Sequence, residues 1–281
     1  MVKQVGIIKP EVSIDTNHAF VESFKAASYG AQSSRKTLQI GYLIETFGAE
    51  NVGIISCEHG LGTIASLTDS RYVFVADNLD KLREGYGWAR ERFSNTSQWV
   101  CVDGGSRVLQ WINHEIFIGA QRALDGVIAG TDKRALDPAI RKYASYIEKE
   151  ISLNSQQMWW RTGYECERLL DSFIKIGSNM YWTFWEDQTS ISQYVKGVPW
   201  IPETPGKGAL AAVKGAFDFI FRLVPDGENS TAHFRNPAGT ITNYTKTRDD
   251  WRGGVRVPDS IANFNLAEFY QLTTTKGAIK Q

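Results

Sequence analysis

The sequence is poor in the residues that build disulfide frameworks and metal centres, with three cysteines and four histidines in 281 residues. Cys57, Cys101 and Cys166 are far apart, which fits neither a disulfide scaffold nor a cysteine-based metal site. The histidines are equally scattered. We therefore expect free thiols and a reducing compartment.

An excess of either charge is also missing, because 31 Lys and Arg residues balance 31 Asp and Glu residues. No overall field draws the protein to nucleic acid or an anionic membrane, so any contact with a polyanion requires a local patch. The N-terminal residues contain no apolar run suited to a signal peptide or a membrane span. We expect a cytoplasmic protein with no membrane partner.

What the chain does have is a composition typical of globular proteins, with 42% hydrophobic and 22% charged residues. Its length allows one substantial core. We expect an N-terminal arm over 1–23, one main domain over 24–272 and a C-terminal tail over 273–281.

Short apolar runs alternate with amphipathic stretches along this main domain. The expected strands are 24–29, 51–57, 72–76, 99–102, 180–185 and 218–224. The expected helices are 36–47, 77–93 with an acidic cap, most of 106–176, and 265–272. We expect a long loop over 186–215 and a hairpin around 237–239. This order predicts an α/β fold with a mostly parallel sheet flanked by helices and a C-terminal β-hairpin.

A glycine-led loop lies between the first expected strand and the first expected helix, with the sequence Gly30-Ala31-Gln32-Ser33-Ser34-Arg35-Lys36-Thr37. It approximates the P-loop pattern G-x-x-x-x-G-K-[ST], in which backbone N–H groups and a helix N-terminus face phosphate. Lys36 would reach the outer phosphates, and Thr37 would offer its hydroxyl to Mg²⁺. The loop predicts ATP and Mg²⁺ as ligands, with the nucleotide held by Gly30, Ser33, Ser34, Arg35, Lys36 and Thr37.

Arg35 stands where the P-loop pattern has its second glycine. Glycine lets the backbone pass close to phosphate, so an arginine there disturbs the loop and puts catalysis in doubt. A guanidinium is also a strong phosphate partner, so Arg35 can act as a ligand instead. The alternative to a nucleotide site is a solvated, serine-rich turn that caps a helix.

Two acidic residues follow later strands. Glu58 closes the segment Ile55-Ser56-Cys57-Glu58, which resembles the strand end that carries the catalytic glutamate in RecA-type recombinases. Asp103 ends the run Trp99-Val100-Cys101-Val102-Asp103, which resembles a Walker B strand. The resemblance implies that Glu58 orients the attacking water and that Asp103 holds Mg²⁺ through water. Each could instead be an ordinary polar residue at a strand end.

The order of these segments is similar to that in RecA-like ATPases encoded by bacteriophages, from about Phe24 to Leu272. Phe217-Asp218 matches a further strand of that family. The resemblance implies a γ-phosphate sensor at Glu186 or Gln188, although Trp185 can occupy that position. It also implies that Lys246 and Arg248 enter a neighbouring subunit's site as catalytic residues of a ring or filament. A solvated basic turn is the alternative for this pair.

The resemblance places single-stranded DNA on the expected loop over 186–215, at Tyr194, Lys196, Trp200, Lys207 and Lys214. Aromatic rings can stack on bases while lysines follow the backbone. Trp200 lies between two prolines and could instead anchor the loop to the core. The cluster Trp159-Trp160-Arg161 favours a helix packing face over a base platform.

These features predict an ATP-binding and ATP-hydrolysing RecA-like protein that acts on DNA in recombination, repair or replication. The resemblance implies a phage-encoded protein in the host cytoplasm. The alternative is a non-catalytic virion or assembly component that keeps a decayed P-loop fold.

Overall fold

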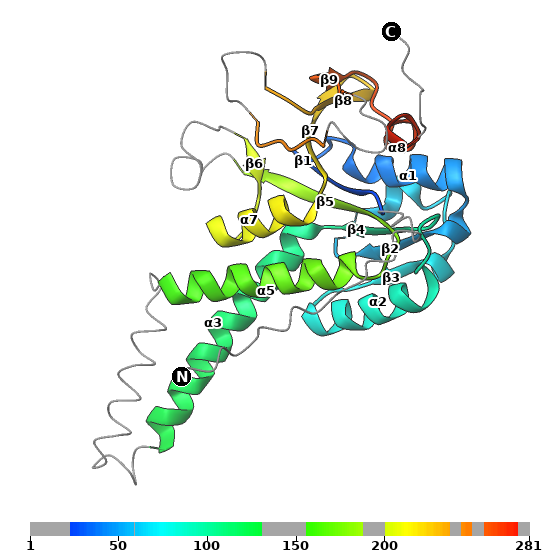
Figure 1. The fold of residues 1–281 in the computed structure, drawn as a ribbon. Coiled ribbons are helices and arrows are strands. Elements are labelled where there is room, and N and C mark those ends of the chain that lie inside the picture. The colour runs from blue at the N-terminus through cyan, green and yellow to red at the C-terminus, as the bar shows by residue number, and fades with distance from the viewer. Residues whose placement is uncertain are drawn as a thin grey trace, which may run out of the picture.

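The computed structural model describes residues 23–58, 60–130, 156–187, 200–236, 243–248 and 256–274. These residues form an α/β fold in which helices cover both faces of a mixed, mostly parallel sheet (Figure 1). The expected N-terminal arm and most of the expected tail lie outside the described residues.

The sheet of the described part of the chain has the order β3-β2-β4-β5-β1-β7-β8-β9, and β6 pairs with β5. Strands β1 to β5 and β7 run parallel. The strands are β1 Lys25–Gly30, β2 Val52–Ser56, β3 Val73–Val75, β4 Trp99–Asp103, β5 Asn179–Asp187, β6 Ile201–Pro202, β7 Phe219–Asp226, β8 Asn229–His233 and β9 Ser260–Ile261. The carboxyl ends of β1, β2, β4 and β5 therefore share one edge of the sheet.

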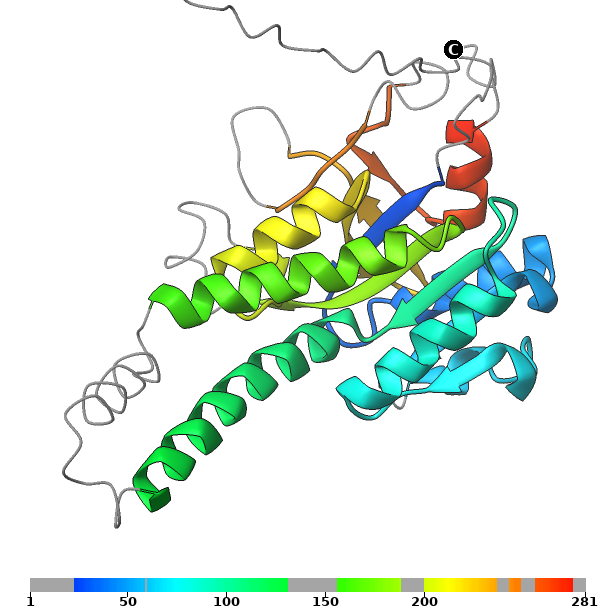
Figure 2. The same ribbon diagram turned by 60° about the horizontal axis from the view of Figure 1, so that its bottom comes forward.

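Helices cover the two faces unequally. They are α1 Lys36–Phe47, α2 Leu79–Arg92, α3 Gly105–Gly130, α5 Gln156–Ile174, α7 Lys207–Ala216 and α8 Leu266–Thr274. Short 3₁₀ turns form at Ala49–Asn51, Leu61–Ile64 and Ser70–Tyr72. Helices α1 and α8 cover one face and α2, α3, α5 and α7 the other, while α3 extends beyond the sheet (Figure 2).

Side chains of the central strands alternate between the two cores. On β5, Trp182 and Phe184 pack with the α2, α3, α5 and α7 side, whereas Tyr181 packs with α1 and α8. All three are almost fully buried. Burial on both faces explains why these strands appear in the sequence as continuous apolar runs rather than alternating ones.

Most expected elements are confirmed within a few residues, but two details, the loop at 207–216 and the acidic cap of α2, are wrong. Residues 207–216 form α7 instead of part of a loop, because Ala209, Leu210 and Val213 give that segment a buried helical face. A hairpin joins β7 to β8 through Gly227, whose φ is 59°. The further turn expected around 237–239 lies outside the described residues and stays a prediction. Asn78 rather than Asp77 caps α2, accepting a hydrogen bond from the Lys81 N–H at 2.9 Å.

Candidate functional site

The glycine-led loop leaves the carboxyl end of β1 and runs into α1. A Cβ at Gly30 would overlap the Leu223 carbonyl oxygen and lie 2.6 Å from Ser34 Oγ, so only glycine fits there. Ser33 and Arg35 both have left-handed backbones, with φ of 69° and 64°. This conformation disfavours side chains that carry a Cβ, which gives a second reason for glycine at the position of Arg35.

The Lys36 ammonium is held inside the loop. Nζ donates to the carbonyl oxygens of Gly30 and Ala31, both at 2.8 Å, and to Ser34 Oγ at 3.1 Å. Burial lowers the pKa of Lys36, and the carboxylates of Glu58 and Asp103 oppose that shift. A partly buried ammonium with three donors is suited to bind a phosphate oxygen.

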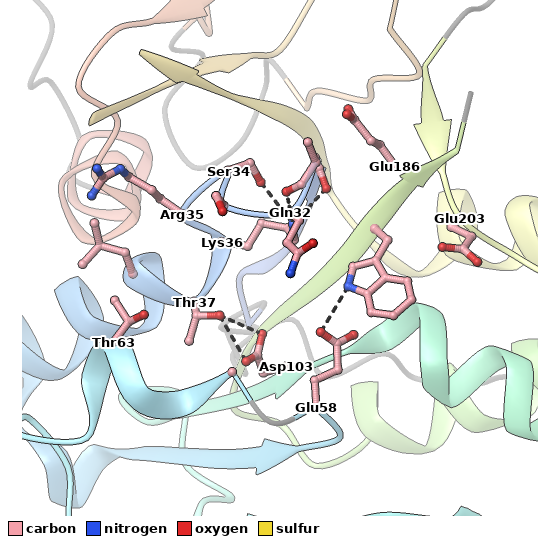
Figure 3. A pocket seen from close by; sticks show the side chains of 16 residues that line it. Gln32, Ser34, Arg35, Lys36, Thr37, Glu58, Thr63, Asp103, Glu186 and Glu203 are labelled. Carbon is pink, nitrogen blue, oxygen red and sulfur yellow. Dashed lines mark hydrogen bonds between the residues drawn. The ribbon is translucent and has the colours of Figure 1, made fainter. Parts of the chain in front are cut away.

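Asp103 lies at the end of β4, next to the first turn of α1. The Thr37 hydroxyl donates a hydrogen bond to Asp103, with 3.1 Å between Oγ1 and Oδ2 (Figure 3). The Thr183 hydroxyl donates to Asp103 Oδ1 at 2.7 Å. Burial raises the pKa of Asp103, while the two threonine hydrogen bonds lower it. The structure thus brings together the two expected magnesium ligands, Thr37 and Asp103.

Glu58 follows β2 and lies on the same edge. Its Oε2 accepts a hydrogen bond from the Trp185 indole N–H at 3.1 Å, and its Oε1 is buried without a hydrogen-bond partner. Burial raises the pKa of Glu58, the nearby Asp103 carboxylate adds to the rise, and the Trp185 hydrogen bond opposes it. A carboxylate whose pKa is raised by burial accepts a proton more readily than a solvated one.

These groups line one cavity of about 860 Å³. Its wall comes from the loop, α1, the segment after β2, the end of β4, β5 and the segment after β6. The lining residues are Gly30, Ala31, Gln32, Ser33, Ser34, Arg35, Lys36, Thr37, Leu38, Glu58, Gly60, Thr63, Asp103, Trp185, Glu186 and Glu203. Sequence reasoning did not assign six of them to the site, because neither their type nor their spacing distinguishes them from other residues; they are Ala31, Gln32, Leu38, Gly60, Thr63 and Glu203.

Of the two expected sensor residues, Glu186 lines the cavity and Gln188 lies outside the described residues. The Glu186 carboxylate accepts from Arg222 Nε at 3.0 Å, in an ion pair that is mostly buried. The Arg222 guanidinium in turn stacks 3.7 Å from the centre of the Trp200 ring. This chain of contacts connects the cavity with β7 and the start of β6.

Lys246 and Arg248 do not line the cavity. Lys246 Nζ donates to the carbonyl oxygens of Lys214 and Phe217 at 2.8 and 2.6 Å. Arg248 pairs with Asp218 at 3.2 Å, at the start of β7. Within one chain, both side chains are therefore bound to the end of α7 and the segment after it.

The expected DNA residues are not gathered on one loop. Tyr194 and Lys196 lie outside the described residues, whereas Lys207 and Lys214 are exposed on α7. Trp200 is anchored, since its ring stacks on Arg222 and its carbonyl oxygen accepts from the Tyr29 hydroxyl at 3.2 Å.

Of the expected packing face Trp159-Trp160-Arg161, Trp159 packs on Phe117 with ring centres 5.9 Å apart, whereas the packing role expected of Trp160 is wrong. Its side chain is 71% exposed and stacks on Tyr164, with ring centres 5.7 Å apart.

The cavity fits a magnesium nucleotide by the chemistry of its donors. Among the described residues, no group of three or more His, Cys, Asp or Glu side chains could hold a metal ion by itself. Mg²⁺ does not need such a group, because it keeps several waters and takes one or two protein ligands plus phosphate oxygens. Thr37 and Asp103 would supply these protein ligands, and Lys36 would bind the phosphates.

No protein-family model matches the chain, and no curated protein matches its sequence. In the described ranges, no helix is both long and apolar enough to cross a membrane. The evidence on function is therefore the α/β fold and the geometry of the cavity.

Proposed function

We propose that this protein binds ATP with Mg²⁺ and hydrolyses it as a RecA-like ATPase that acts on DNA. The observation that carries the proposal is the convergence of Lys36, Thr37, Glu58 and Asp103 on one cavity beside a glycine-led loop. These four residues come from three separate segments: the start of α1, the segment after β2 and the end of β4. A solvated turn that caps a helix would have no need of the two distant carboxylates.

Binding follows from the charges and donors of the loop. The N-terminus of α1 carries a partial positive charge, and its first N–H groups have no partner within the helix. Lys36 would exchange its bonds to the loop carbonyls for bonds to phosphate oxygens, which are stronger because both partners are charged. Bound Mg²⁺ would neutralise phosphate charge, and Thr37 and Asp103 would hold it.

Hydrolysis requires a group that orients water toward the outermost phosphate. Glu58 is the carboxylate suited to this task, because it lines the cavity separately from the Thr37 and Asp103 pair. Its raised pKa favours proton acceptance. Asp103, which is more deeply buried and bonded to two threonines, is suited to the metal instead.

The roles in DNA recombination, repair or replication, the ring or filament and the phage origin rest on the resemblance in sequence order. The exposed lysines of α7, Lys207 and Lys214, offer positive charge for a nucleic-acid backbone. Fold by itself does not specify function, so these finer statements depend on the ATPase test below.

Titration of the purified protein with ATP, with and without Mg²⁺, tests the proposal. We expect Mg²⁺-dependent binding, and Lys36→Ala should abolish it because the loop loses its only lysine. Lys81→Ala is a matched control, since Lys81 is exposed on α2 and pairs with Glu84. Circular dichroism of each variant shows whether the loss of binding reflects unfolding.

The non-catalytic structural module remains the second candidate. The observation that favours it is the left-handed backbone of Arg35 at a glycine position. No affinity for the wild-type protein at millimolar ATP, with or without Mg²⁺, would establish this second candidate and reject the ATPase.

A further inference from the structure

One hydrogen bond joins two strands that are not neighbours in the sheet. The Trp185 indole on β5 reaches Glu58 after β2, although β4 lies between the two strands (Figure 3). Gly104 comes just after Asp103, has a φ of 107° and lies against the Glu58 side chain. A Cβ at Gly104 would lie 2.7 Å from Glu58 Cγ and 2.9 Å from Oε1, so glycine makes room for the carboxylate.

We propose that Trp185 is a positioning residue for Glu58. Its indole N–H fixes one carboxylate oxygen and thereby sets the orientation in which Glu58 meets the attacking water. This inference rests on the proposed ATPase function. In the family resemblance, the residue at this position senses the γ-phosphate. The inference gives Trp185 a different task, because an indole N–H can only donate a hydrogen bond and here donates it to the Glu58 carboxylate.

The backbone of Trp185 is held rigidly enough for this task. Its N–H donates to Ser106 Oγ at 3.0 Å, and the Ser106 hydroxyl donates to the Glu203 carbonyl oxygen at 2.9 Å. The Glu203 N–H completes the ring by donating to the Trp185 carbonyl oxygen at 2.8 Å. These bonds connect β5, the start of α3 and the segment after β6.

The side chain of Trp185 is otherwise poorly placed for a purely structural role. It is 38% exposed and lines the cavity, whereas Trp99 and Trp182 are fully buried in the two cores. A large ring at the wall of a polar cavity gains little from burial. Its bond to Glu58 is the specific interaction that distinguishes it from other exposed apolar side chains.

The first experiment compares Trp185→Phe with wild type in ATP binding and turnover. Phenylalanine keeps a ring but loses the N–H, so we expect an ATP Kd within about twofold of wild type and a kcat lower by about ten- to a hundredfold. Trp185→His restores a ring N–H and should recover part of kcat. Trp88→Phe is the matched control, because Trp88 lies on α2 outside the cavity.

A second measurement does not depend on activity. The indole ¹H–¹⁵N resonance absent from Trp185→Phe identifies Trp185, and it should shift in Glu58→Ala. Glu84→Ala, which removes an exposed carboxylate on α2, should leave it in place.

An unchanged kcat in Trp185→Phe, or an indole resonance that Glu58→Ala does not move, would overturn the inference. A loss of ATP affinity as large as the loss of kcat would overturn it as well, because Trp185 would then be a nucleotide ligand. Failure of the proposed function has a different signature. The wild type would bind no ATP, which removes the catalytic role, while the resonance would still report the contact with Glu58.

Discussion

Arg35 shows how one residue can satisfy the charge of a site and conflict with its backbone. Its φ of 64° lies in the left-handed region, and its side chain makes no capping hydrogen bond to the N-terminus of α1. The guanidinium lies 3.5 Å from the Gly227 carbonyl oxygen, and Figure 3 shows it directed away from Thr37 and Asp103. Arg35 would therefore have to turn in order to bind a phosphate.

We expect Arg35→Gly to raise the free energy of unfolding by about 0.5–1 kcal/mol. Relief of the left-handed strain, about 1–2 kcal/mol, exceeds the greater freedom of glycine in the unfolded chain. Thermal and denaturant unfolding measure the change. Arg35→Ala is the control, because it removes the same guanidinium but keeps a Cβ, and it should give no such gain. Equal stabilities of the two variants would contradict the backbone explanation.

ATP titration of Arg35→Gly separates the two roles left open for this residue. A phosphate ligand would lose a charged hydrogen bond worth roughly 1.5–3 kcal/mol, which corresponds to about ten- to a hundredfold weaker binding. A decayed glycine position would instead give tighter binding and faster turnover, because the loop regains close approach to phosphate.

Among the elements, the crossing of α5 and α7 depends on two glycines. A Cβ at Gly163 would lie 2.8 Å from the Gly208 Cα, so the helix backbones meet directly. In the sequence, the glycines of residues 186–215 indicated a loop. Gly208 instead lies in α7, where it allows the close packing of that helix on α5. Turn-forming residues within a segment thus indicated a loop where the tertiary contact required a helix.

We expect Gly163→Ala to lower the free energy of unfolding by about 1–2 kcal/mol. Overpacking costs about 1–3 kcal/mol, and the higher helix propensity of alanine offsets part of it. Gly215→Ala is the matched control, since Gly215 is exposed on α7 and a Cβ there would meet nothing within 4 Å. Denaturant unfolding should show the control to be neutral or slightly more stable. A Gly163→Ala variant as stable as the control would contradict the close crossing.

At the scale of the whole molecule, the two cations that the resemblance assigns to a neighbouring subunit's site lie away from the cavity of their own chain. Lys246 and Arg248 are bound to their own chain away from the cavity. Burial lowers the pKa of Lys246 and raises that of Asp218, which pairs with Arg248. Any contribution of this pair to catalysis would have to reach the cavity of another copy.

If the protein is an ATPase that assembles, we expect turnover per subunit to rise with protein concentration. The reason is that Lys246 and Arg248 would complete a neighbour's site. A dilution series that spans the assembly transition measures this effect. Mixing Lys36→Ala with Arg248→Ala subunits should restore activity, because each supplies the residue that the other lacks. A constant rate per subunit, together with no recovery on mixing, would refute the arrangement in trans.

The sequence alone was enough to locate most of the central strands, two helices and the loop of the site. Apolar runs and helical periodicity located β1, β2, β4, β5, α1 and α8 within a few residues, because both faces of the central strands are buried and the helices have one buried side. The glycine-led loop and the carboxylates of Glu58 and Asp103 were also identified, since parallel strands bring their carboxyl ends to one edge.

Only the tertiary structure decided which side chains meet across that edge. The order β2-β4-β5 sets the distance from Trp185 to Glu58, and the neighbouring positions of β5, β1 and β7 bring Glu186 to Arg222. The tertiary structure also decided where two basic side chains lie. Lys246 binds a carbonyl oxygen at the end of α7 and Arg248 pairs with Asp218, away from the cavity of their own chain. The physical reason is that periodicity reports the face on which a residue lies, whereas such contacts depend on the lateral order of strands and the reach of side chains.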